Sequence, residues 1–157
     1  MIRYQDEKYM RKCIDLSRQS VKKEGRPFGS LIVIDDDIVV ESVNNAGENL
    51  TDHAEVLVMR AACRKLGNND LSMCTLYSNC EPCPMCSFMI REYRIKRVVF
   101  ALRSPKMGGF SKWQILGDKE ICEFDTVFSE PPEVTTGILS REASVVFDEI
   151  GWRMYQD

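Results

Sequence analysis

Apolar residues near the start of the chain follow a helical spacing and then give way to two strand-like runs. Five residues at positions i, i+3, i+4, i+7 and i+11 predict a helix over residues 6–24: Met10, Cys13, Ile14, Ser17 and Val21. Gly25 stands where such a helix would end. Two apolar runs, 29–34 and 38–43, flank a turn of three aspartates. They predict a β-hairpin over residues 28–43.

The rest of the chain alternates helical patterns with short apolar runs. We expect helices at 53–66, 84–93 and 137–154, and strands at 75–78, 97–101 and 126–129. Pro84 suits the first turn of the second of these helices. Pro105, Gly108 and Gly109 interrupt residues 102–125, so this segment is expected to be a loop with a short helix at 112–116.

The order of these elements predicts the fold class. Strands separated by single helices favour parallel pairing, whereas the hairpin adds an antiparallel pair. We therefore expect an α/β protein, a three-layer α/β/α sandwich with a mixed sheet of about five strands. No linker or repeat divides the sequence, which predicts a single domain over residues 1–157.

Composition narrows the class of protein. Apolar residues make up 44% and charged residues 29% of the chain, the balance of a globular protein without a membrane span. The net charge is −3, which argues against a protein that mainly holds a long nucleic-acid backbone. Met1–Met10 is charged and lacks the apolar run of a secretory signal. With that absence, the odd number of seven cysteines predicts a reduced, cytoplasmic protein.

Four residues in two short motifs carry the candidate chemistry. His53 is the one histidine in the chain and stands two residues before Glu55. Cys83 and Cys86 follow in a Pro-Cys-x-x-Cys motif at the start of the next predicted helix. Imidazole and thiolates suit zinc, and three protein ligands leave a fourth position open, as in catalytic sites. Both helix starts are expected at the same end of the sheet, where α/β proteins place their active sites.

Other interpretations fit the same residues. A structural zinc site would need a fourth ligand, for which Cys74, Cys80, Cys122 or a carboxylate is available. A Cys-x-x-Cys pair is also typical of redox proteins, and a lone histidine at a helix start is often a cap or a surface residue. From a different class of function, the chain could be a non-catalytic, zinc-stabilised binding module. Such a module would have no use for Glu55.

The two motifs together resemble those of a known family. His-x-Glu followed by Pro-Cys-x-x-Cys is the signature of zinc nucleobase deaminases. Residues 76–86 and 94–100 make the chain similar to the cytidine/deoxycytidylate deaminase superfamily. Within it, the chain looks most like the branch of guanine deaminases, cytosine deaminases and tRNA adenosine deaminases. The resemblance implies a cytidine deaminase-like fold, one Zn²⁺ per subunit and a homodimer.

The resemblance also implies roles for individual residues. His53, Cys83 and Cys86 would hold the zinc ion. Glu55, which is not a ligand, would be the catalytic residue that takes a proton from water and returns protons to the ring nitrogen and the leaving amine.

Three further residues are substrate-binding candidates. Asn44 would hydrogen-bond the base, with Asn45 as the alternative, and a plain turn residue is equally compatible. Phe28 would stack on the base, although a Phe beside a buried strand often belongs to the core. Tyr155 would lie in a C-terminal tail that covers the active site, in some relatives that of the partner subunit.

The substrate has three candidates. A free base such as guanine or cytosine fits the acidic charge and the Pro27-Phe28-Gly29 motif. The wobble adenosine of tRNA is the alternative, because residues 106–111 and 137–142 look like that subgroup. A nucleotide comes third, since no phosphate-binding motif is evident. We expect a small purine or pyrimidine as the partner and no membrane.

Overall fold

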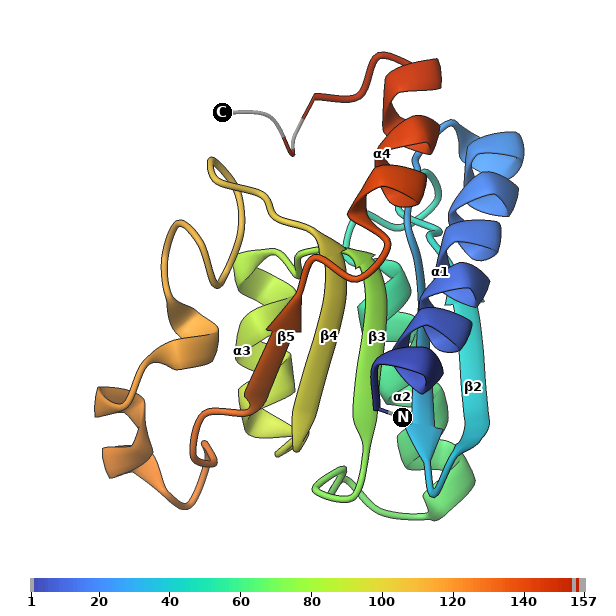
Figure 1. Cartoon of the computed structure of the whole chain (residues 1–157). Helices are drawn as coiled ribbons and strands as arrows, with labels where there is room; N and C mark the ends of the chain where they lie inside the picture. Colours follow the sequence, from blue (N-terminus) through green and yellow to red (C-terminus); the bar gives the residue numbers. More distant parts are fainter. Residues whose placement is uncertain (1, 154, 156–157) are drawn as a thin grey trace.

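A computed structural model describes residues 2–153 and 155. Its elements are α1 (Ile2–Glu24), β1 (Gly29–Ile34), β2 (Asp37–Val43), α2 (Ala54–Leu66), β3 (Thr75–Cys80), α3 (Pro84–Glu92), β4 (Arg97–Leu102), the 3₁₀ turns η1 (Ile115–Gly117) and η2 (Glu120–Phe124), β5 (Glu133–Thr136) and α4 (Ser140–Glu149) (Figure 1).

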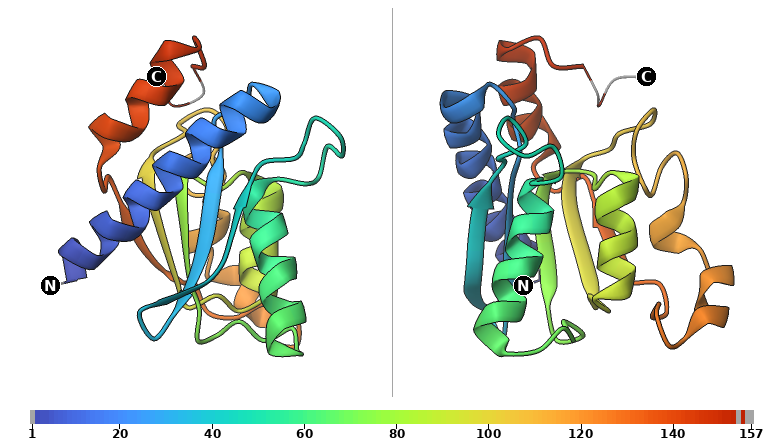
Figure 2. Two further views of the ribbon diagram at one scale, coloured as in Figure 1. Left: turned by 90° about the vertical axis from the view of Figure 1, so that its right-hand side faces the viewer. Right: turned by 180° about the vertical axis from the view of Figure 1, so that it is seen from behind.

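The strands form one sheet in the order β2-β1-β3-β4-β5. β1 pairs antiparallel with both β2 and β3, whereas β3, β4 and β5 run parallel. Helices α1 and α4 cover one face of the sheet, and α2 and α3 cover the other (Figures 1 and 2). The predicted mixed five-stranded sheet in a three-layer sandwich is therefore confirmed. None of the helices over residues 2–153 and 155 is long and apolar enough to cross a membrane.

Each face of the sheet carries its own hydrophobic core. Along β4, Val99 and Ala101 contribute to the core with α1 and α4, whereas Val98 and Phe100 contribute to the core with α2 and α3. This alternation is the period of two that a strand imposes. The stripe predicted for α1 is confirmed, because all five of its residues are buried or partly buried. Gly29 allows β1 to pack closely against α1, because a Cβ at position 29 would lie 2.4 Å from the Cβ of Leu16.

Two sequence predictions for the last third of the chain were wrong. Residues 126–129 do not form a strand, because the backbone N–H groups of Val127 and Phe128 turn back to the carbonyl of Phe124, at 2.8 and 2.9 Å. The edge strand is instead β5, which starts directly after Pro131-Pro132. The final helix is shorter than the predicted 137–154, since Leu139 adopts a left-handed conformation and α4 ends at Glu149.

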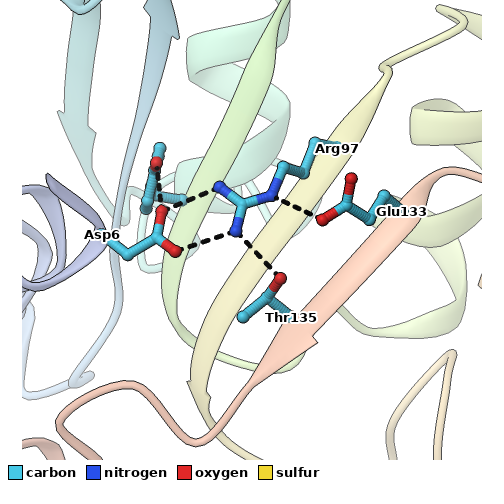
Figure 3. Close-up of polar contacts among 5 residues, drawn as sticks. Asp6, Arg97, Glu133 and Thr135 are labelled. Carbon is cyan, nitrogen blue, oxygen red and sulfur yellow. Dashed lines mark hydrogen bonds and ion pairs between the residues drawn. The ribbon is translucent and has the colours of Figure 1, made fainter. Parts of the chain in front are cut away.

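A buried ion pair ties α1 to β4 (Figure 3). The Arg97 guanidinium donates to both carboxylate oxygens of Asp6 at 2.8 Å, and to Thr135 Oγ1 at 2.9 Å. Tyr77 also donates to Asp6, at 2.7 Å. Only 3% of the Asp6 side chain and 15% of the Arg97 side chain are exposed. Glu133 contacts the same guanidinium at 3.2 Å but is 70% exposed.

These contacts predict a sharp difference between two substitutions. Asp6→Ala should lower the free energy of unfolding by about 3–5 kcal/mol, because it removes the buried partner of Arg97 and leaves this largely buried cation with the solvated Glu133 alone. Glu133→Ala is the matched control and should cost about 1 kcal/mol or less, since its ion pair is solvated. Urea denaturation of both variants measures the difference. Similar losses in the two variants would contradict the proposed anchor.

Candidate metal centre

Two helix N-termini meet at the carboxyl end of β3 (Figure 1). His53 occupies the N-cap position of α2, with extended backbone angles. Cys83 occupies the N-cap position of α3, and Pro84 begins that helix because its fixed φ suits the first turn. Cys86 follows in the first turn of α3. The connections that lead into α2 and α3 thus place the His53 imidazole close to the sulfurs of Cys83 and Cys86.

The geometry of these three side chains fits a zinc ion. Their ligand atoms all lie within 4.8 Å of one another. His53 Nδ1 is 3.5 Å from Cys83 Sγ and 3.6 Å from Cys86 Sγ. A tetrahedral zinc ion with ordinary bond lengths places sulfur and nitrogen ligands about 3.6 Å apart. The predicted ligand set therefore comes together with the spacing that zinc requires.

The predicted alternatives for a fourth ligand lie outside this group. Cys74, Cys80 and Cys122 are free cysteines elsewhere in the described structure, and none of them belongs to the cluster. Within residues 2–153 and 155, the group consists of His53, Cys83 and Cys86 alone. A closed structural site therefore has no support from the described side chains, whereas an open three-ligand site does.

The electrostatics of the cluster suit a soft cation. The pKa of Cys83 is lowered to about 4, mainly because Cys86 donates a hydrogen bond to its sulfur, with His53 contributing less. Conversely, the pKa of Cys86 is raised by that same hydrogen bond and by burial. The pKa of His53 is raised mainly by its hydrogen bond with Cys83, while burial and the charge of Arg26 oppose this shift. A divalent cation displaces such shared protons when it binds.

Glu55 lies beside the cluster, from the first turn of α2. Its carboxylate is 5% exposed, and Oε1 accepts a hydrogen bond from Ser78 Oγ of β3 at 3.1 Å. Oε2 is 3.8 Å from Cys86 Sγ. Burial, followed by the negative charge of Cys83, raises the pKa of Glu55. The carboxylate is therefore held next to the three candidate ligands.

A cavity of about 150 Å³ opens onto this cluster. Its lining residues are Arg26, Phe28, Asn44, His53, Glu55, Cys80, Glu81, Cys83 and Trp152. Phe28 meets Trp152 edge to face, with ring centroids 5.6 Å apart, and meets Phe147 in the same way at 5.8 Å. Trp152 follows α4, so the segment directly after that helix contributes to the cavity wall.

The predicted substrate-binding residues have different placements. Phe28 and Asn44 both line the cavity. The Asn44 side chain already accepts a hydrogen bond from the Ala54 backbone at 3.1 Å and donates to Glu24 at 2.8 Å. Asn45, the alternative, accepts from Lys23 instead and does not line the cavity.

Tyr155 does not line the cavity of its own chain. Its ring packs edge to face on Phe147, and its hydroxyl donates to Asp148. Trp152 occupies the position that sequence reasoning assigned to Tyr155, on the tail beside the cavity. Arg26 and Glu81 also line the cavity and were not predicted to do so. Arg26 stands directly before the Pro-Phe-Gly motif, and that position was the one signal available for it.

Glu81 holds the loop that runs from Ser104 to Ser111 beside the cavity. Its carboxylate accepts hydrogen bonds from the backbone N–H groups of Ser104, Phe110 and Ser111, at 3.2, 3.2 and 2.9 Å. The Ser111 hydroxyl donates to it as well, at 2.5 Å. The loop approaches so closely that a Cβ at Gly108 would lie 1.3 Å from Glu81 Oε2. Glu81 therefore fastens this loop to the segment that carries Cys83.

We expect Glu81→Ala to lower the free energy of unfolding by about 2–3 kcal/mol, because it leaves buried backbone N–H groups without an acceptor. Chemical denaturation measures this loss. Glu130→Ala removes an exposed carboxylate and should stay within about 0.5 kcal/mol of the unaltered protein. If the two variants unfolded alike, Glu81 would have no anchoring role.

Comparison with known proteins identifies the family. Residues 3–102 match the model of the cytidine and deoxycytidylate deaminase zinc-binding region. The chain is 34% identical to the tRNA-specific adenosine deaminase of Bacillus subtilis over 140 residues, which span 88% of this chain and 83% of the relative. It is 41% identical to the guanine deaminase of the same organism over 98 residues, which span 60% of this chain and 63% of that enzyme.

A solved structure supports the same assignment. It comes from studies of A-to-I editing by tRNA:A34 deaminases, and it superposes with a TM-score of 0.77 at 28% identity. The superposition covers 85% of this chain and 94% of that one. The matched region contains all three candidate metal ligands, which fit the zinc-binding description of the family. The chain therefore belongs to the cytidine/deoxycytidylate deaminase superfamily, whose zinc-dependent enzymes hydrolyse the C–N bonds of cyclic amidines.

Proposed function

We propose that this enzyme removes the exocyclic amino group of a free nucleobase, such as guanine or cytosine, and releases ammonia. The observation that carries the proposal is the size of the cavity beside Glu55, about 150 Å³. A cavity of about this volume binds benzene in an engineered protein, so this one has room for the amino-bearing ring of a base. The walls from Phe28 and Trp152 offer flat apolar surfaces for such a ring.

The residues around the cavity suit each step of the reaction. When zinc is bound by three protein ligands, it supplies the Lewis acidity that makes water nucleophilic near neutral pH. The Glu55 carboxylate takes a proton from the attacking water and delivers protons to the ring nitrogen and the leaving amine. Ser78 keeps that carboxylate oriented through its hydrogen bond of 3.1 Å. Water adds to the amino-bearing carbon, the C–N bond breaks, and a ring carbonyl replaces the amine.

The wobble adenosine of tRNA is the second candidate substrate. It is favoured by the 34% identity to a tRNA-specific adenosine deaminase over most of both chains. The charge balance of the chain, −3 overall, favours the free base, because an RNA substrate calls for a basic surface.

Ammonia release across a panel of substrates tests the proposal. The panel contains free guanine, cytosine and adenine, their nucleosides, and an anticodon stem-loop with adenosine at the wobble position. We expect turnover of a free base that exceeds turnover of the stem-loop. Activity on the stem-loop alone would overturn the proposal in favour of the second candidate.

A further inference from the structure

Arg26 is a cation on the cavity wall that has no hydrogen-bond or ion-pair partner for its side chain among the described residues. It follows the end of α1, is partly buried and lines the cavity with Phe28 and Glu55. Among residues 2–153 and 155, its guanidinium forms no hydrogen bond or ion pair. The neighbouring Glu24 carboxylate is turned away to other donors within the described structure, since it accepts from Asn44 and from the Gly47 backbone, both at 2.8 Å. A guanidinium with five N–H donors is thus left for a ligand.

A second residue of the cavity lining, Trp152, carries a donor without a partner in the described part of the chain. The indole Nε1 of Trp152 is buried and has no hydrogen-bond partner within the described part of the chain. Buried donors without partners are rare in folded proteins, because the lost hydrogen bond with water is not replaced. This donor and the partly buried cation of Arg26 belong to residues that line one cavity, which indicates a ligand that brings acceptors with it.

The backbone that carries Arg26 is held firmly. Asn79 donates to the Pro27 carbonyl at 2.7 Å and accepts from the Gly29 backbone N–H at 2.9 Å. The Phe28 N–H also donates to the Arg26 carbonyl, at 3.1 Å. The backbone of Arg26 is therefore fixed beside the cavity. A fixed backbone suits a residue that distinguishes substrates by their shape and polarity.

We propose that Arg26 is a specificity-determining residue that donates hydrogen bonds to a ring carbonyl of the substrate. The proposal rests on the proposed function, in which a free base occupies the cavity. A cavity of about 150 Å³ holds little more than an aromatic ring and its substituents, so we expect the acceptor for Arg26 on the ring. Guanidinium groups bind the carbonyl edge of guanine in nucleic-acid complexes by the same chemistry.

Arg26 could donate to a ring carbonyl of guanine and of cytosine in the same way. In each base, the amino-bearing carbon and a carbonyl carbon are separated by one ring nitrogen. Adenine has a C–H group at the corresponding position. Arg26 would therefore favour amino bases that carry this carbonyl, and it would disfavour adenine, including an adenine presented by tRNA.

Paired substrates that differ in the carbonyl and in the ring N–H that accompanies it test the role of Arg26. Guanine is compared with 2-aminopurine, and cytosine with 4-aminopyrimidine, for the zinc-loaded wild-type protein and for Arg26→Ala. We expect Arg26→Ala to lower kcat/KM for the carbonyl-bearing base by about 10- to 100-fold, mainly through KM. The partner lacking the carbonyl should change by no more than about 3-fold. The kcat/KM of Arg26→Lys for the carbonyl-bearing base should lie between those of the wild-type protein and Arg26→Ala. Lysine keeps the charge but lacks the planar, two-pronged donor group of arginine.

Binding gives a second readout that does not depend on turnover. Equilibrium dialysis of the same bases against zinc-loaded Glu55→Gln, with and without Arg26→Ala, should show the same selective loss. Arg103→Ala is the control, because Arg103 is exposed, stacks on Phe110 and lies outside the cavity. Zinc content should be equal in all variants.

The outcomes separate the two proposals. If free bases are deaminated but Arg26→Ala weakens both members of a pair equally, or neither, the role of Arg26 is overturned while the proposed function stands. If no free base is bound or deaminated by the wild-type protein, the proposed function fails and the inference fails with it. A selective loss for the carbonyl-bearing bases supports both.

Discussion

Glu55→Gln is expected to lower kcat by about 10²- to 10⁴-fold, the range that a positioned general acid–base contributes. The amide keeps the size of the side chain and still offers an oxygen to Ser78, which donates to Oε1 at 3.1 Å. It cannot take up or release the proton that hydrolysis requires. Since Glu55 is not one of the three clustered ligands, the variant should keep one zinc ion per chain.

Ammonia release measures the activity of this variant, and mass spectrometry of the metal measures its zinc content. Asp52→Asn is the matched control, because Asp52 lies three residues away and pairs with Arg60 on the surface at 3.2 Å. That substitution should leave kcat close to the wild-type value. Near-normal turnover by zinc-loaded Glu55→Gln would remove Glu55 from the proposed role.

Cys86→Ala is expected to weaken zinc binding by more than about 100-fold. Loss of a residue that merely supports a metal ligand costs 10- to 100-fold in affinity, and loss of a ligand should exceed that. The variant should have no measurable deaminase activity. In the wild-type protein, added zinc should raise the melting temperature, because an ion that binds only the folded chain stabilises it. This rise should disappear in Cys86→Ala.

Zinc titration against a competing chelator and thermal melts with and without zinc check this prediction. Cys80→Ala is the control, since Cys80 is a buried neighbour on β3 that does not belong to the ligand group. It should retain the wild-type zinc affinity. If Cys80→Ala lost zinc while Cys86→Ala kept it, the assignment of ligands would be wrong.

The sequence predicted the metal cluster well because each of its members sits in a short local motif. Pro84 begins α3 directly after Cys83, and Cys86 follows within the same turn. His53 and Glu55 flank the start of α2 in the same way. Helix starts are encoded by neighbouring residues, and the strand order then brings the two starts to one end of the sheet.

The cavity walls could not be predicted in the same way, because they depend on contacts between distant parts of the chain. Trp152 reaches Phe28 across more than a hundred residues, and Glu81 anchors a loop that begins at Ser104. The misplaced edge strand has a similar cause. Arg91 is buried, and its guanidinium donates to the Ser129 carbonyl at 2.7 Å, which holds that segment against α3 and not in the sheet. The homodimer implied by the family resemblance stays a prediction.

A crystal structure of the zinc-loaded protein, with anomalous data at the zinc edge, tests the central claim most directly. We predict a single ion bonded to His53 Nδ1, Cys83 Sγ and Cys86 Sγ, with solvent as the fourth ligand within hydrogen-bonding distance of Glu55. An ion whose fourth ligand is a protein side chain, or a protein that is fully active without any metal at these residues, would contradict the account.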